Sequence, residues 1–68
     1  MTMDLITRYH FDNAIRAADL ATLPADKRAR ADGHIRDARD DLLACPEAAD
    51  EILADLAAAL AGLREEEG

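Results

Sequence analysis

The residues with metal-binding chemistry are one histidine and two aspartates in the middle of the chain. His34, Asp37 and Asp41 are three and four positions apart, so in a helix they share one flank. Imidazole and carboxylate side chains at this spacing can bind a divalent metal ion. One helix supplies few ligands, however, and the chain has no Glu-x-x-His pair of the kind that forms a di-iron site in a helical bundle. These residues alternate with Arg30 as in a solvated ion-pair face, so we expect no metal and no other cofactor.

Nucleophilic catalysis finds no support in the residue types. The chain has no serine, and its single cysteine, Cys45, precedes a proline and has no histidine near it in the sequence. The glycines form no phosphate-binding loop. A pair of carboxylates has no diagnostic value among 15 acidic residues. We therefore predict that the protein is not an enzyme.

A short basic cluster is the one feature that suggests nucleic acid as a ligand. A helix-turn-helix protein would place Lys27, Arg28 and Arg30 against phosphates. The net charge of −7 and the near absence of aromatic residues among the basic ones argue against this function. We expect no direct nucleic-acid binding, and a small DNA-binding regulator remains an alternative.

The acidity is concentrated in the last third of the chain. Residues 46–68 hold seven acidic side chains against Arg64 alone. A negative surface repels nucleic acid and anionic membranes and favours basic protein surfaces, including those that hold nucleic acid. This predicts a larger protein with a basic surface as the partner. A nucleic-acid mimic that blocks a basic groove is a second alternative.

Cys45 also bears on the compartment, because a lone cysteine forms no intramolecular disulfide and suits a reducing environment. The first five residues contain no basic segment followed by an apolar core, so they do not resemble a signal peptide. No stretch approaches the roughly 20 apolar residues that span a bilayer. We therefore expect a cytoplasmic protein without membrane contact.

Three helices must position these residues. Helix-forming residues dominate, valine is absent, and two prolines divide the chain into segments of similar length. We predict helices over about 3–21, with Thr2 as its cap, 24–44 and 46–64, followed by a frayed acidic tail over 65–68. The whole chain, 1–68, forms one domain.

Apolar residues recur at heptad spacing in the second and third helices. The stripes are Ala31, Ile35, Ala38, Leu42 and Cys45 in the second, and Ala49, Leu53, Leu56, Leu60 and Leu63 in the third. The register runs through Pro46 unbroken, so one long kinked helix is an alternative to the αα-hairpin that we prefer. The first helix is apolar over a broad arc, with Phe11 and Ile15 at one edge and Leu5 at the other; the arc itself comprises Ile6, Tyr9, Ala14, Ala17, Ala18 and Leu20.

These patterns predict an all-α fold, a small three-helix protein in which the second and third helices form an αα-hairpin and the first helix packs across it. Much of the apolar content is alanine, which adds little core volume. Small chains without disulfides or metals often gain stability from a second subunit. We therefore expect a homodimer, with the first helix around Ile6, Tyr9, His10 and Phe11 at or near the interface.

The function that fits these properties best is protein binding by a small acidic modulator or inhibitor that occupies a surface of a larger partner. His10, with Asn13 one turn on, is either a partner contact or a half-buried histidine bonded to a carbonyl or water. Alanines on the third helix allow a second helix to approach closely. A structural or assembly subunit is the third alternative. The predicted partner-binding residues are Tyr9, His10, Phe11, Asp50, Asp55, Ala54, Ala58 and Ala61.

Overall fold

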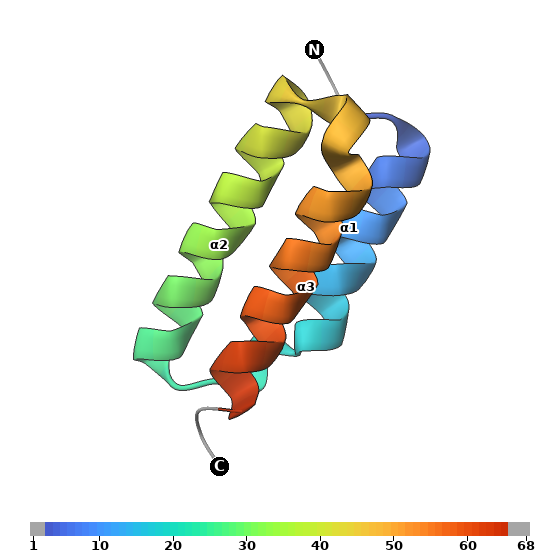
Figure 1. Ribbon diagram of the computed structural model, residues 1–68. Coiled ribbons are helices and arrows are strands. Elements are labelled where there is room, and N and C mark those ends of the chain that lie inside the picture. The colour runs from blue at the N-terminus through green and yellow to red at the C-terminus, as the bar shows by residue number, and fades with distance from the viewer. Residues whose placement is uncertain (1–2, 66–68) are drawn as a thin grey trace.

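Three α-helices joined by two short connections form residues 3–65, the part of the chain that this computed structural model describes (Figure 1). The described residues contain no strand, so the all-helical prediction is confirmed. The elements are α1 (Leu5–Ala18), a 3-10 turn η1 (Leu20–Thr22), α2 (Ala25–Ala44), a 3-10 turn η2 (Pro46–Ala48) and α3 (Ala49–Glu65).

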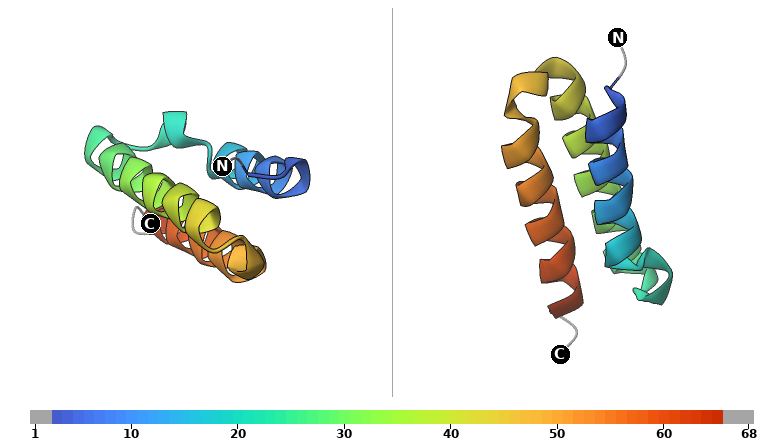
Figure 2. Two further views of the ribbon diagram at one scale, coloured as in Figure 1. Left: turned by 90° about the horizontal axis from the view of Figure 1, so that it is seen from above. Right: turned by 90° about the vertical axis from the view of Figure 1, so that its right-hand side faces the viewer.

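The helices run alternately down, up and down, so α1 and α3 point in the same direction (Figure 1). α3 packs against both α2 and α1, whereas α1 and α2 make few direct contacts. The bundle is elongated, with extents of 36 × 17 × 16 Å (Figure 2). α2 and α3 form the predicted hairpin, and the turn at Pro46 excludes the alternative of one kinked helix.

The side chain of Asp4 begins α1. Its Oδ1 accepts a hydrogen bond of 2.7 Å from the backbone N–H of Thr7, which satisfies one of the free donors of the first turn. This hydrogen bond holds the pKa of Asp4 below its ordinary value. The helix therefore starts at Leu5, two residues later than predicted, and the predicted cap, Thr2, lies outside the described residues.

Asp19 ends α1 earlier than the sequence pattern indicated. Its backbone lies in the left-handed region, with φ 50° and ψ 60°, and its N–H donates to the carbonyl of Arg16. Aspartate tolerates this conformation better than most residues. Thr22 stabilises the turn that follows, because its hydroxyl donates to the Asp19 carbonyl at 2.8 Å. The prediction that the first helix continues to residue 21 was therefore wrong, because α1 ends at Ala18 and a separate 3-10 turn follows it.

The second break follows from Pro46. A residue before proline avoids helical geometry, and Cys45 accordingly has φ −134° and ψ 69°. The Cys45 side chain is exposed, so its predicted place in the apolar stripe of the second helix was wrong. α3 extends to Glu65, which the sequence pattern assigned to a frayed tail; residues 66–68 lie outside the described part.

The core is made of the predicted stripes of α2 and α3 together with one face of α1. Leu42, Leu60 and Leu63 are its largest fully buried side chains, and Ile35 and Leu53 pack at its margin. Alanines supply much of the α2 side of the core. Its buried members are Phe11, Ala18, Ala31, Ala38, Leu42, Leu56, Leu60 and Leu63.

The face of α1 that meets the core differs from the predicted arc. Phe11, expected at the edge, is only 8% exposed and fills the core. Leu5, Ile6 and Tyr9 are 85%, 72% and 64% exposed and lie on the outward side. Phe11 belongs to the same buried cluster as Ala31 and Ala38 of α2 and Leu56 of α3, and a phenyl ring is the largest apolar side chain that α1 can bury there.

Two basic side chains close the end of the bundle where α1 and α3 finish. Lys27, from α2, donates to the carbonyl of Leu63 at 3.1 Å, and Arg64, from α3, donates to the carbonyl of Ala18 at 2.9 Å. Each cation therefore satisfies a carbonyl in the last turn of another helix, where the helix dipole also favours positive charge.

Candidate functional site

A groove runs between α1 and α3 on the side away from α2. Its upper part, a pocket of about 420 Å³, lies beside the first turns of α3, and its lower part, of about 160 Å³, lies near the end of that helix. Ala14 and Ala57 line both parts. We call this the α1–α3 groove; its other lining residues are His10, Asn13, Asp50, Leu53, Ala54, Ala17, Ala18, Leu60, Ala61 and Arg64.

The polar groups of the α1–α3 groove lie at its two ends. His10, Asn13 and Asp50 line the upper pocket, and Arg64 lines the lower one. Between them the walls are mainly alanine, because α1 and α3 both carry small side chains where they face each other. Small side chains let another helix or a bulky side chain approach the backbone closely.

Large apolar side chains are exposed on α1, the helix that forms one wall of this groove. Leu5, Ile6 and Tyr9 are the exposed large hydrophobic residues of residues 3–65. The Tyr9 ring packs edge-on against His10, with ring centroids 5.6 Å apart, and His10 itself lines the upper pocket. Tyr9 is therefore connected to the groove through His10. Clustered exposed apolar residues of this kind mark interaction surfaces.

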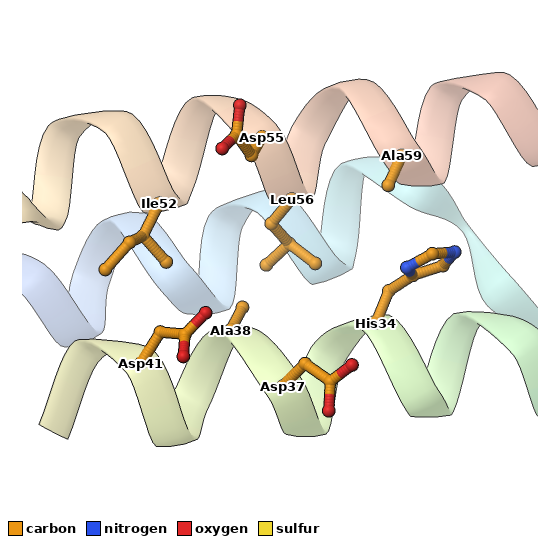
Figure 3. Close-up of a pocket in the computed structure, with 8 residues that line it drawn as sticks. All are labelled: His34, Asp37, Ala38, Asp41, Ile52, Asp55, Leu56 and Ala59. Atoms are coloured by element: carbon orange, nitrogen blue, oxygen red, sulfur yellow. The ribbon is translucent and has the colours of Figure 1, made fainter. Parts of the chain in front are cut away.

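A second groove, of about 230 Å³, lies between α2 and α3 (Figure 3). Its floor is apolar and includes Leu56, which points from α3 toward α2. His34 and Asp41 reach toward α3 from α2, while the carboxylate of Asp55 points away from α2. We call this the acidic groove; it is lined by His34, Asp37, Ala38, Asp41, Ile52, Asp55, Leu56 and Ala59.

His34, Asp37 and Asp41 do line one groove, as their spacing in the sequence indicated. Within residues 3–65, however, no group of three His, Cys, Asp or Glu side chains is placed to hold a metal ion. The outward direction of Asp55 gives the physical reason, because the carboxylate from α3 does not join those from α2 (Figure 3). The acidic groove is instead a surface with an apolar floor and a carboxylate rim.

The structure divides the predicted partner-binding residues among several surfaces. His10, Asp50 and Ala54 meet in the upper part of the α1–α3 groove, and Ala61 lines its lower part. Tyr9 is exposed beside it, Ala58 is exposed on α3, and Asp55 belongs to the acidic groove. The prediction that Phe11 contacts a partner was wrong, because its side chain lies in the core of the subunit, where a partner cannot reach it.

One member of the basic cluster, Lys27, has a structural role that its sequence position did not reveal. Lys27 is half-buried and donates to the Leu63 carbonyl, so its ammonium group helps to close the bundle. Sequence reasoning also missed the role of Arg64. The sequence did place Lys27 near the start of a predicted helix and Arg64 at the end of one. It could not indicate their acceptors, because these carbonyls lie 36 and 46 residues away in the chain.

None of the helices in the described part of the chain is long and apolar enough to cross a membrane. Comparison with known proteins adds no functional assignment: no protein-family model matches the chain, and neither a curated protein nor a solved structure shows significant similarity to it.

Proposed function

We propose that this protein is a small, non-catalytic, acidic protein-binding modulator or inhibitor that occupies a basic surface of a larger protein partner. The observation that carries the proposal is the acidic groove, where the carboxylates of Asp37 and Asp41 stand beside an apolar floor. A lysine or arginine side chain fits this combination, because its aliphatic stem packs on apolar atoms while its charged end bonds to carboxylates.

The charge of the whole chain supports the same partner. The net charge of −7 attracts a basic surface from a distance and raises the rate of association, and the apolar floor of the groove contributes affinity after contact. Carboxylates, one imidazole and apolar side chains line the groove, a combination that suits binding of a cationic side chain with an aliphatic stem.

The proposal includes a cytoplasmic location and a homodimer. An exposed free thiol at Cys45 suits a reducing compartment. The homodimer is supported by the exposed side chains of Leu5, Ile6 and Tyr9, which lie on a different part of the surface from the acidic groove. One copy can therefore contact a second copy of the chain through α1 and a larger protein through α2 and α3.

The test is capture of partner proteins on immobilised wild-type protein and on two double variants of equal charge. Asp37→Asn with Asp41→Asn removes the carboxylates of the acidic groove, whereas Asp32→Asn with Asp40→Asn removes two exposed carboxylates elsewhere on α2. We expect a protein identified by mass spectrometry to bind the wild type and the control but not the groove variant. Equal capture by all three proteins would contradict the proposal.

The salt dependence of the same capture separates a modulator from a nucleic-acid mimic. A mimic places carboxylates where phosphates normally bind, so its affinity falls steeply as ionic strength rises. Binding that depends on the apolar floor is less sensitive to salt. We expect capture to survive at a salt concentration that releases nucleic acid from the same partner.

A further inference from the structure

Tyr9 is exposed beside a pocket that its own side chain does not fill. Its ring contacts His10, and His10 lines the pocket of about 420 Å³ in the upper part of the α1–α3 groove. Tyr9 is nevertheless 64% exposed and is absent from the lining. An exposed aromatic side chain and a pocket lined by its ring partner His10 therefore lie close together.

The chemistry of the pocket suits a tyrosine. Leu53, Ala54 and Ala57 provide apolar walls for a ring, and the carboxylate of Asp50 can accept a hydrogen bond from a phenolic hydroxyl. A buried tyrosine needs such an acceptor for its hydroxyl group while its ring is desolvated.

Two-fold symmetry determines which part of a second copy meets this pocket. An axis parallel to α1 keeps residues of equal height together, so Tyr9 of one copy meets the other at the height of His10, which lines the pocket. An axis perpendicular to α1 reverses the second helix. Suppose that the reversed α1 of the second copy lies in the groove, equally close to α1 and α3 of the first copy. The symmetry operation that exchanges the two α1 helices would then place the second α3 on top of the first. The parallel arrangement avoids this clash.

The charges of the helices favour the same arrangement. Between residues 4 and 19 two arginines face three aspartates, so α1 is almost neutral, whereas residues 46–65 carry five acidic side chains and one arginine. In the parallel arrangement the two α1 helices meet at the axis and the two α3 helices lie on opposite outer sides. The acidic helices, which repel each other, are thereby kept apart.

We infer that the protein is a parallel two-fold homodimer in which Tyr9 of each copy occupies the upper pocket of the α1–α3 groove of the other, with Ile6 of both copies near the axis. The occupant of this groove is thus a second copy of the chain. The inference rests on the homodimer included in the proposed function, and it is independent of the acidic groove.

The first test measures self-association of matched variants by sedimentation equilibrium. Tyr9→Ala should raise the dissociation constant of the dimer at least about tenfold, the usual effect of removing an aromatic residue central to an interface. Ala57→Arg places a large charged side chain in the pocket and should make the protein monomeric. Ala29→Arg, at an exposed position of α2, should remain dimeric at the same protein concentration. The chain has one tyrosine and no tryptophan, so its fluorescence reports the burial of Tyr9 directly on dilution.

The second test fixes the orientation by cross-linking in a Cys45→Ser background. Copies carrying only Tyr9→Cys are mixed with copies carrying only Ala54→Cys or only Ala61→Cys, so that a mixed disulfide can form only between two molecules. A disulfide requires Cα atoms within about 7 Å of each other. We expect the Ala54→Cys copies, with the new cysteine in the upper pocket, to cross-link to Tyr9→Cys, and the Ala61→Cys copies, at the lower end, to remain unlinked.

Three results would overturn the inference. Cross-linking through position 61 instead of 54 would show a reversed dimer. A dimer that Tyr9→Ala leaves unchanged would place the interface elsewhere. A chain that is monomeric at all concentrations, yet captures a larger protein through the carboxylates of the acidic groove, would exclude the second copy and leave the protein-binding function standing.

Discussion

Arg64→Ala should destabilise the bundle although Arg64 is an exposed residue at the end of a helix. Its guanidinium donates to the carbonyl of Ala18 at 2.9 Å, across 46 residues of sequence. Ala18 ends α1 and is itself buried, so its carbonyl depends on a side chain from another helix for a partner.

The magnitude follows from the kind of contact. A hydrogen bond between a charged group and a neutral one stabilises a fold by about 1.5–3 kcal/mol, and a cation at a helix C-terminus adds about 0.3–1 kcal/mol. Because Arg64 is largely exposed, water replaces part of this interaction, and we expect a loss of about 1–2 kcal/mol. In a chain of 68 residues this corresponds to a decrease in Tm of roughly 4–15 °C.

Thermal unfolding followed by circular dichroism measures this loss, at one fixed protein concentration because dimerisation would otherwise shift Tm. The matched control is Arg36→Ala, which removes an exposed arginine from α2 and should change stability by less than about 0.5 kcal/mol. Arg64→Lys, which keeps the charge, should recover part of the loss. If Arg64→Ala and Arg36→Ala melt at the same temperature, the contact with Ala18 does not stabilise the fold and the reasoning fails.

Three other changes test the core, the helix start and the α2 backbone. Leu56→Asp should abolish the folded helical spectrum, because Leu56 is 3% exposed and an unpaired charge cannot be buried there. Asp12→Ala, at an exposed position, should leave Tm nearly unchanged. Comparable melting of the two variants would contradict the assigned helical face. The folded-state pKa of Asp4 is lowered, so its stabilising effect is present above its ordinary pKa, near 4, and is lost as pH falls through the lower folded value. Asp4→Asn cannot titrate, so Tm of the wild type should fall more than that of Asp4→Asn between pH 5 and pH 2, and parallel curves would exclude this role. Gly33→Ala should stabilise the protein by about 1 kcal/mol, because a Cβ at this helical position meets no atom within 4 Å; an unchanged or lower midpoint in urea would disprove it.

The helices and their breaks could be predicted because their causes are local. Pro24 and Pro46 each kink or break a helix through the geometry of their own rings, and the heptad spacing of Leu56, Leu60 and Leu63 can be read without knowledge of a neighbouring helix. The ends were less accurate. Composition alone would have continued the first helix to residue 21, but Asp19 adopts a left-handed backbone and the Thr22 hydroxyl bonds to the Asp19 carbonyl.

The candidate site could be predicted only in part. His10, Asp50 and Ala54 were selected separately from the sequence, and the structure brings them into one pocket because α1 and α3 run side by side in the same direction. The carboxylates of Asp37 and Asp41 share a groove because they are one turn apart on α2, a relation that the sequence already contains.

The sequence by itself determined which segments are helical and which face of α2 and α3 is buried. That the chain turns back at Pro46, instead of continuing as one kinked helix, was decided by the tertiary structure. A narrow apolar stripe has only one face to bury, so its orientation follows from spacing. α1 has a broad apolar arc, and its own residues do not select which part of that arc faces inward. Only the tertiary structure decided that Phe11 enters the core while Tyr9 faces solvent, because the choice depends on how α1 is seated against the helices that share the core with it.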